Sequence, residues 1–170
     1  CIGEKEVFVV ESVADELKAQ MVRYNGYELN ATQIEALSQE AFVKGDNGHL
    51  ATNRELIGRN ASVLAARIGL NLDDQLRMLI GETDAGHPFV FEEQMMPFLP
   101  IIRVPNVDQG IRASIEAEHG YQHTAIIHSR NIENMHNMAR AMDTTIFVKN
   151  GPSYAGVGLG GEGFGTYSIA

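Results

Sequence analysis

Apolar residues follow two kinds of spacing along this chain: short unbroken runs, and positions that recur every three or four residues. Short runs rich in β-branched residues are typical of buried strands, and the wider spacing is typical of helices with one buried face. The short runs predict strands at 6–10, 77–82, 98–104, 124–128 and 145–149. The wider spacing predicts helices at 11–24, 30–42, 60–68, 107–118 and 132–142.

Polar residues indicate where some of these elements begin and end. We expect Ser12 and Asp15 to cap the first helix, and Asn30 or Thr32 to begin the second. The cluster KGDNG at 44–48 predicts a turn after the second helix.

Strand and helix alternate between residues 98 and 149. This alternation is typical of βαβ units, in which a right-handed crossover joins two parallel strands. We therefore expect an α/β fold with a mostly parallel sheet and helices on both faces. We expect residues 1–150 to form this α/β domain, and residues 151–170 to form a glycine-rich loop and the start of a terminal strand.

Length and composition narrow the class of protein. The 170 residues suffice for one domain, and the apolar fraction of 44% is that of a globular protein. The net charge is −9 with the acids spread along the chain, which disfavours a nucleic-acid partner because such proteins carry a clustered basic face. No apolar run approaches the roughly 18–20 residues that span a bilayer, and no signal peptide is present, so we expect no membrane partner and a cytoplasmic location. The chain lacks an initial methionine, which we interpret as processing or a fragment.

A glycine-rich segment follows the last predicted strand. Gly156, Gly158 and Gly160 belong to GVGLGG, which contains a literal G-x-G-x-x-G. A dinucleotide site needs a helix after this motif, whereas residues 164–169 (FGTYSI) have the composition of a strand. We interpret the segment as a loop that lets a substrate or another backbone approach closely, and composition favours a plain surface loop equally.

Histidines and acids offer weaker candidates for a site. His119 and His123 have the spacing of a helical zinc pair, but Gly120 lies between them and no further ligand supports them, so we expect no metal site. His128 ends a predicted strand, where sites collect in α/β sheets. Glu92 and Glu93 are adjacent in an extended segment, so they point to opposite sides and only one of them can face a site.

Cys1 is the single cysteine, so no internal disulfide can form. A free cysteine can be a nucleophile when its thiolate is stabilised. The positive charge of Lys5 would stabilise the thiolate of Cys1, whereas the negative charges of Glu4 and Glu6 would destabilise it. The residues around Cys1 therefore leave both a reactive and an inert, buried thiol open.

Four segments together resemble the aldehyde dehydrogenase superfamily, in particular its CoA-acylating branch from propanediol- and ethanolamine-utilisation microcompartments. They are CIGEKEVFVVESVADE, FEEQMMPFLPIIRV with VDQGI, EHGYQHTAIIHS and NGPSYAGVGLGGEG. They run from the first residue almost to the last, and the first and last are the most specific to the acylating branch.

This resemblance implies the catalytic domain of such an enzyme, without its NAD-binding domain. It implies that the thiolate of Cys1 attacks a short-chain aldehyde, that hydride passes to NAD⁺, and that CoA displaces the acyl group from the resulting thioester. It further implies that Glu93 holds the nicotinamide ribose, that Met95 lies against the nicotinamide, and that the glycine-rich loop lines the aldehyde and CoA channel.

The resemblance also implies partners: propionaldehyde or acetaldehyde, CoA, further copies of the chain in a homo-oligomer, and a microcompartment shell. Because the NAD-binding glycines and an upstream Asn oxyanion donor are absent from this sequence, we expect the isolated chain to lack dehydrogenase activity.

Two other functions fit parts of the sequence. An N-terminal-nucleophile hydrolase would use the α-amino group of Cys1 as its base, but it requires a two-layer antiparallel sandwich, which the alternation at 98–149 disfavours. A non-catalytic fragment that uses the fold for assembly is the other alternative.

Overall fold

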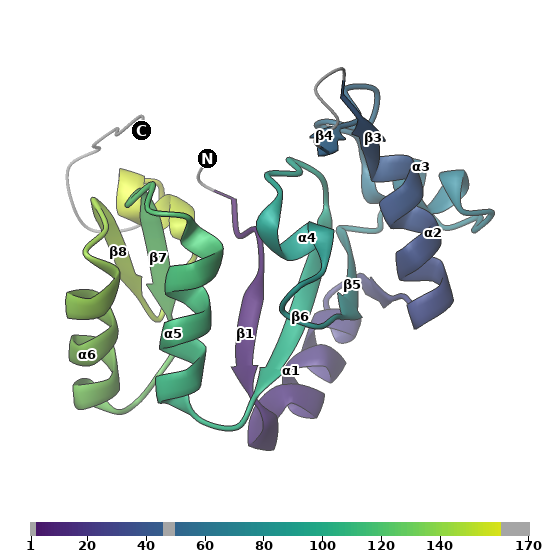
Figure 1. The fold of residues 1–170 in the computed structure, drawn as a ribbon. Helices are drawn as coiled ribbons and strands as arrows, with labels where there is room; N and C mark the ends of the chain where they lie inside the picture. The colour runs from purple at the N-terminus through teal and green to yellow at the C-terminus, as the bar shows by residue number, and fades with distance from the viewer. Residues whose placement is uncertain (1–2, 46–49, 161–170) are drawn as a thin grey trace. The chain divides into compact units, whose positions relative to one another are not determined.

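A computed structural model of the protein describes residues 3–45 and 50–160 (Figure 1). The chain divides into two compact units, one of Lys5–Pro105 and one of Cys1–Glu4 with Asn106–Ala170. The assignment of residues 1–150 to a catalytic domain and of 151–170 to a loop of its site stays a prediction. Among the described residues no helix combines the length and the apolar character that crossing a bilayer requires.

The unit Lys5–Pro105 is built on a sheet in which all neighbouring strands run parallel. The spatial order of its strands is β1 (Val7–Val10), β6 (Phe98–Val104), β5 (Met78–Glu82) and β2 (Gly26–Glu28). Central strands of parallel sheets are covered on both faces, and β6 is accordingly a nearly continuous apolar run, FLPIIRV. The mostly parallel α/β architecture expected from the sequence is confirmed.

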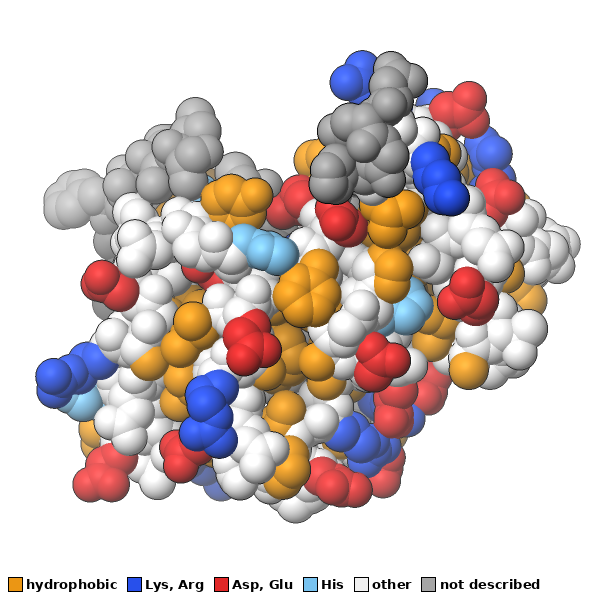
Figure 2. Space-filling view, viewed as in Figure 1, with side chains coloured by type: hydrophobic (Ala, Val, Ile, Leu, Met, Phe, Trp, Pro, Cys, Tyr) orange, Lys and Arg blue, Asp and Glu red, His pale blue; other side chains and the backbone are white. Residues whose placement is uncertain are grey.

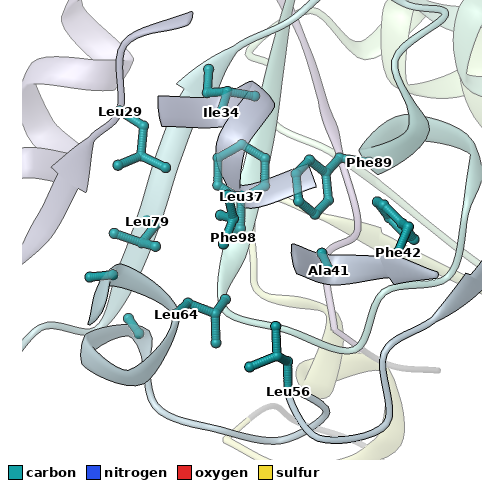
Figure 3. Packing of buried hydrophobic residues seen from close by; sticks show 12 residues of the cluster. Leu29, Ile34, Leu37, Ala41, Phe42, Leu56, Leu64, Leu79, Phe89 and Phe98 are labelled. Atoms are coloured by element: carbon teal, nitrogen blue, oxygen red, sulfur yellow. The ribbon is translucent and has the colours of Figure 1, made fainter. Parts of the chain in front are cut away.

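Neighbouring residues of a strand face opposite sides, and each side of this sheet has its own buried cluster. On one side, Leu79 and Phe98 pack with three helices: α2 (Ala31–Ala41), α3 (Ala61–Arg67) and α4 (Pro88–Phe91). Figure 3 shows this cluster, in which the ring of Phe89 lies 4.4 Å from that of Phe98 and 5.0 Å from that of Phe42. On the other side, Ile80 and Leu99 pack with α1 (Glu11–Arg23), so helices cover both faces as expected.

The helix starts differ in how they are capped. The helix α1 begins at Glu11, directly after β1, with Val10 as its N-cap and no side-chain cap, so the expected Ser12–Asp15 cap is wrong. The strand runs straight into the helix and leaves Ser12 inside the first turn. Of the two candidates for α2, Asn30 is the N-cap and forms a capping box with Gln33.

Two short elements near the second helix were not expected. The strands β3 (Phe42–Lys44) and β4 (Leu50–Thr52) form an antiparallel pair directly after α2. The expected turn at 44–48 falls between them, and its residues 46–48 lie outside the described residues.

The second unit contains two parallel strands, β7 (Thr124–Ile127) and β8 (Ile146–Lys149). The helices α5 (Val107–Glu118) and α6 (Ile132–Met142) pack against Ala125, Ile127 and Phe147. A 3₁₀ helix, η1 (Ser153–Val157), packs through Val157 against Ile146 and Val148. Of the strands expected at 98–104, 124–128 and 145–149, β7 and β8 pair in parallel with each other, whereas β6 pairs in parallel with β1 and β5.

Candidate functional site

The segment that links α4 to β6 carries the two residues that the family resemblance assigns to the cofactor. Glu93 is exposed, Gln94 is only 2% exposed, and Met95 is 48% exposed. Glu93 and Met95 are thus both presented to solvent, while Gln94 between them is buried. The segment therefore offers a carboxylate and a flexible apolar side chain that a ligand could reach.

The backbone of this segment is held by hydrogen bonds from the region after β3. The Thr52 hydroxyl donates to the carbonyl of Glu93 at 2.6 Å, and the amide of Gly58 donates to the carbonyl of Met95 at 3.1 Å. Met95 has φ 53°, a left-handed conformation that non-glycine residues rarely adopt. These bonds hold Met95 in that conformation and fix the course of the chain into β6.

The short helix α4 that precedes the segment is anchored by its own cap. Nδ1 of His87 accepts a hydrogen bond from the amide of Phe89 at 3.2 Å, and the imidazole stacks on the ring of Phe89. Burial lowers the pKa of His87 below its ordinary 6.5, against the opposing carboxylates of Asp84 and Glu35. The neutral imidazole is thus the form that the fold favours, and it is also the form that can accept this bond.

Cys1 lies outside the described residues, but the chain just after it is described. The carboxylate of Glu4 accepts a hydrogen bond from the amide of Ser153 at 3.0 Å. Ser153 is the first residue of η1, where backbone amides are left without helical partners. Glu4, three residues after Cys1 along the chain, is therefore in contact with the start of the glycine-rich segment.

Glycine is required at these three positions of the segment for different structural reasons. A Cβ at Gly156 would collide with the side chain of Ile146 and stand 3.0 Å from that of Val148. Gly158 is the C-cap of η1 with φ 87°, and Gly160 has φ 73°, both in the left-handed region that favours glycine. Packing thus explains Gly156, and turn geometry explains the other two. The expected strand at 164–169 lies outside the described residues.

The histidines remain apart from any metal-like cluster. His119 is the left-handed C-cap of α5, and Nδ1 of His123 lies 2.6 Å from the Thr124 hydroxyl. His128 and His136 are exposed, and His49 lies outside the described residues. Within residues 3–45 and 50–160, no three His, Cys, Asp or Glu side chains come together as a metal site would require.

A charge network that the sequence analysis missed lies at the carboxyl ends of β5 and β6. The Arg103 guanidinium binds both oxygens of Glu82, at 2.7 and 2.8 Å, and also contacts Asp15 of α1. Lys18 binds Glu82 and, at 2.7 Å, Glu28. Arg103 first and then Lys18 lower the pKa of Glu82 from 4.5 to about 2, against the effect of burial.

The same network raises the pKa of Lys18, mainly through Glu28, and that of Arg103, mainly through Glu82. Acidic and basic side chains are interspersed over the face shown in Figure 2. The cations and acids of the network satisfy one another, which indicates a structural role. Spacing along the sequence gave no sign of it, because its members come from α1, β2, β5 and β6.

Comparison with known proteins finds relatives that match the whole chain, although no family model matches it. The acetaldehyde dehydrogenase (acetylating) EutE of Salmonella typhimurium is 50% identical over 171 residues, which cover 99% of this chain and 36% of the relative. The propionaldehyde dehydrogenase of Rhodopseudomonas palustris, solved with bound propionyl-CoA, is 40% identical with a TM-score of 0.93 and covers 100% of this chain.

A third relative has also been solved. The propionaldehyde dehydrogenase from the fucose utilisation microcompartment of Clostridium phytofermentans is 39% identical, has a TM-score of 0.91, and covers 100% of this chain and 38% of its own. The chain thus spans little more than a third of the length of these three relatives. Over that span, the resemblance stated from the sequence is confirmed.

Proposed function

Since this chain corresponds from end to end to one segment of the CoA-acylating aldehyde dehydrogenases, we propose that it is the catalytic part of such an enzyme. The enzyme oxidises a short-chain aldehyde, propionaldehyde or acetaldehyde, with NAD⁺ and transfers the acyl group to CoA. One observation carries this proposal: the R. palustris enzyme, which has also been solved with bound CoA and an acylated cysteine, matches 99% of this chain at a TM-score of 0.91.

The nucleophile of the proposed reaction is the thiol of Cys1. Its thiolate adds to the aldehyde carbonyl and forms a C–S bond, which gives a hemithioacetal with an oxyanion. Loss of hydride from that carbon leaves a thioester on Cys1, and the thiolate of CoA then displaces the cysteine. Exchange of one thioester for another is nearly isoenergetic, so the acyl group leaves the enzyme still activated.

The nicotinamide cofactor would be held in part by Glu93 and Met95. The exposed carboxylate of Glu93 is suited to accept hydrogen bonds from ribose hydroxyls, and Met95 offers an exposed apolar surface for a flat ring. When bound, the cofactor accepts the hydride. A related engineered glycolyl-CoA reductase has been solved with NADP⁺, and we propose NAD⁺ for this chain because of the family resemblance.

The glycine-rich segment is proposed to line the aldehyde and CoA channel through Gly156, Gly158 and Gly160. The bond between Glu4 and the amide of Ser153 supports this, because it fixes the start of that segment a few residues along the chain from Cys1. The tight turns at Gly158 and Gly160 leave backbone without side chains, which allows a ligand to approach.

His119 is a candidate for a second catalytic residue, beside Cys1, in the transfer of the acyl group to CoA. Two further structures of the C. phytofermentans enzyme carry alanine in place of one cysteine or one histidine. In that enzyme the two replaced positions are separated by the same number of residues as Cys1 and His119 here. His119 is exposed at the end of α5, and we propose that it takes the proton from the CoA thiol.

Partners and location follow from the same comparison and are proposals. We propose that the enzyme assembles as a homo-oligomer and acts in the cytoplasm, within a microcompartment like the one named for the C. phytofermentans relative.

The parallel sheets exclude the alternative of an N-terminal-nucleophile hydrolase. That class requires a sandwich of antiparallel sheets, whereas β3 with β4 is the single antiparallel pair among the described strands. A non-catalytic assembly fragment is the alternative that the experiment below addresses.

The test measures the formation of NADH and acyl-CoA from propionaldehyde, NAD⁺ and CoA. The protein assayed is the complete polypeptide that contains residues 1–170. We expect turnover that Cys1→Ala abolishes, and no turnover by residues 1–170 alone. His119→Gln should lower acyl transfer about 100-fold while NADH formation in the first turnover persists. Activity that survives Cys1→Ala would contradict the mechanism, and robust turnover by residues 1–170 would contradict the need for a further cofactor domain.

A further inference from the structure

Lys5 joins the start of β1 to the end of the short helix α4. Its ammonium donates to the carbonyl of Val90 and, at 3.5 Å, to that of Phe91, the last two residues of α4. It also lies 3.5 Å from the carboxylate of Glu6. An ammonium has three donors, and terminal helix carbonyls lack intrahelical partners, so Lys5 supplies the C-terminal cap of α4.

Gln94 makes the reciprocal connection from the cofactor segment. Its side-chain amide donates to the carbonyl of Lys5 at 3.3 Å and to that of Phe89 at 3.4 Å. The side chain is 2% exposed and its oxygen has no hydrogen-bond partner among the described residues. Burying an amide whose oxygen lacks a hydrogen bond costs free energy. The two hydrogen bonds of the Gln94 nitrogen must therefore offset the cost of burying this side chain.

These contacts define one clamp, which we call the Lys5–Gln94 tether. The tether bonds to the segment Glu92–Met95 through the side chain of Gln94, and Thr52 and Gly58 bond to the carbonyls of Glu93 and Met95. Glu93 and Met95, the residues on either side of Gln94, have exposed side chains. We therefore expect a change in the tether to alter how the segment presents both side chains.

We propose that Lys5 and Gln94 are positioning residues for the nicotinamide cofactor. They tie the segment that presents Glu93 and Met95 to the backbone a few residues after Cys1 along the chain. The inference rests on the proposed function, because it takes Glu93 and Met95 as cofactor residues. Lys5 and Gln94 act through these residues and have no contact with substrate in the proposal.

The test separates cofactor binding from thioester chemistry in the complete polypeptide. Titration calorimetry measures the Kd for NAD⁺, and exchange of labelled CoA into propionyl-CoA measures transfer to and from Cys1, which needs no NAD⁺. We expect Lys5→Met and Gln94→Leu each to raise the Kd and the KM for NAD⁺ about tenfold, the effect of one or two lost hydrogen bonds. CoA exchange should stay within about twofold of the unmodified enzyme.

Matched substitutions at exposed positions serve as controls. Lys44→Met and Gln39→Leu remove the same groups from β3 and α2, and should leave the Kd for NAD⁺ unchanged. Lys5→Arg keeps donors for the carbonyls of α4 and should restore most of the affinity.

The outcomes distinguish the two proposals. An unmodified enzyme that binds no NAD⁺ and shows no CoA exchange would overturn the proposed function. An unmodified enzyme that binds NAD⁺ while the tether variants bind it equally well would overturn the tether alone. A parallel loss of CoA exchange and NAD⁺ affinity, with no rescue by Lys5→Arg, would mean that Lys5 only stabilises the fold and would also overturn it.

Discussion

Gly156 shows how a residue chosen as a site candidate can be required by packing. A Cβ there would collide with Ile146 and crowd Val148 on β8. We expect Gly156→Ala to lower the free energy of unfolding by about 1–3 kcal/mol, the usual cost of inserting a methyl group into a packed core. Urea unfolding followed by circular dichroism measures this.

Gly151→Ala is the matched control for Gly156→Ala. A Cβ at Gly151 would meet its nearest neighbour, Val148, at an ordinary 3.5 Å. The change should therefore leave the free energy of unfolding within a few tenths of a kcal/mol of that of the unmodified chain. Equal stability of the two variants would show that Gly156 has space for a side chain and that its role lies elsewhere.

The charge network around Glu82 links α1, β5 and β6 and makes stability depend on pH. Glu82 has a pKa of about 2 in the folded protein and an ordinary value of 4.5. The carboxylate of Glu82 therefore takes up a proton more readily in the unfolded chain than in the folded one. The stabilisation that ionised Glu82 gives the folded protein is complete above pH 4.5 and is lost as the pH falls through about 2. We expect Arg103→Gln to reduce this loss, because the largest cause of the lowered pKa is removed.

The measurement is the unfolding midpoint of the unmodified chain and of Arg103→Gln between pH 6 and pH 2. Arg54→Gln, an exposed arginine of the same unit, is the control for a general change in net charge. The unfolding midpoints of the unmodified chain and of Arg103→Gln should come closer together toward low pH. The difference in midpoint between the unmodified chain and Arg54→Gln should stay constant. A constant difference for both would show that Glu82 gains nothing from Arg103.

The capping box of α2 is a local element whose contribution can be isolated. The Asn30 side chain accepts from the amide of Gln33 at 3.0 Å, and the Gln33 side chain accepts from the amide of Asn30 at 2.9 Å. We expect Asn30→Ala to cost about 1 kcal/mol in urea unfolding. Asn60 is the N-cap of α3 without a side-chain cap bond, so Asn60→Ala should cost clearly less. Equal costs would contradict the role of the box.

Elements with a clear apolar run or period could be predicted from sequence, including the four-residue strands β1, β7 and β8, and elements without one could not. The bounds of β6 and α6 agree with the sequence prediction, because seven and eleven residues hold enough apolar positions to define a period. The elements α4, β3, β4 and η1 have five residues or fewer and exist through tertiary contacts. Propensity over so few residues carries little information.

The same limit applies to the candidate site. Glu93 and Met95 came from the family resemblance, and their role toward the cofactor stays a prediction; both are exposed, on either side of buried Gln94. The bond between Gln94 and Lys5 joins residues 89 positions apart, and the network of Arg103 with Asp15 joins residues 88 positions apart. No local pattern reports such pairs, since they depend on which strands become neighbours.

At the scale of the whole chain, the two units differ in what each contains. The unit Lys5–Pro105 holds the complete four-stranded sheet together with the buried clusters on both of its faces. The described part of the other unit has a two-stranded sheet, and sheets of that size are marginal without further packing. The units should therefore not depend on each other equally for folding.

We expect a fragment of residues 5–105 to fold alone and to unfold in urea in one cooperative transition, because its core is internal and its size is that of a small domain. Its amide NMR spectrum should be well dispersed, with the slowest hydrogen exchange in β5 and β6, where both faces are buried. A fragment of residues 106–170 should unfold at lower urea with a broader transition. If residues 5–105 gave no cooperative transition while residues 1–170 did, the sheet would need the second unit, and the stabilities of the two units would be coupled.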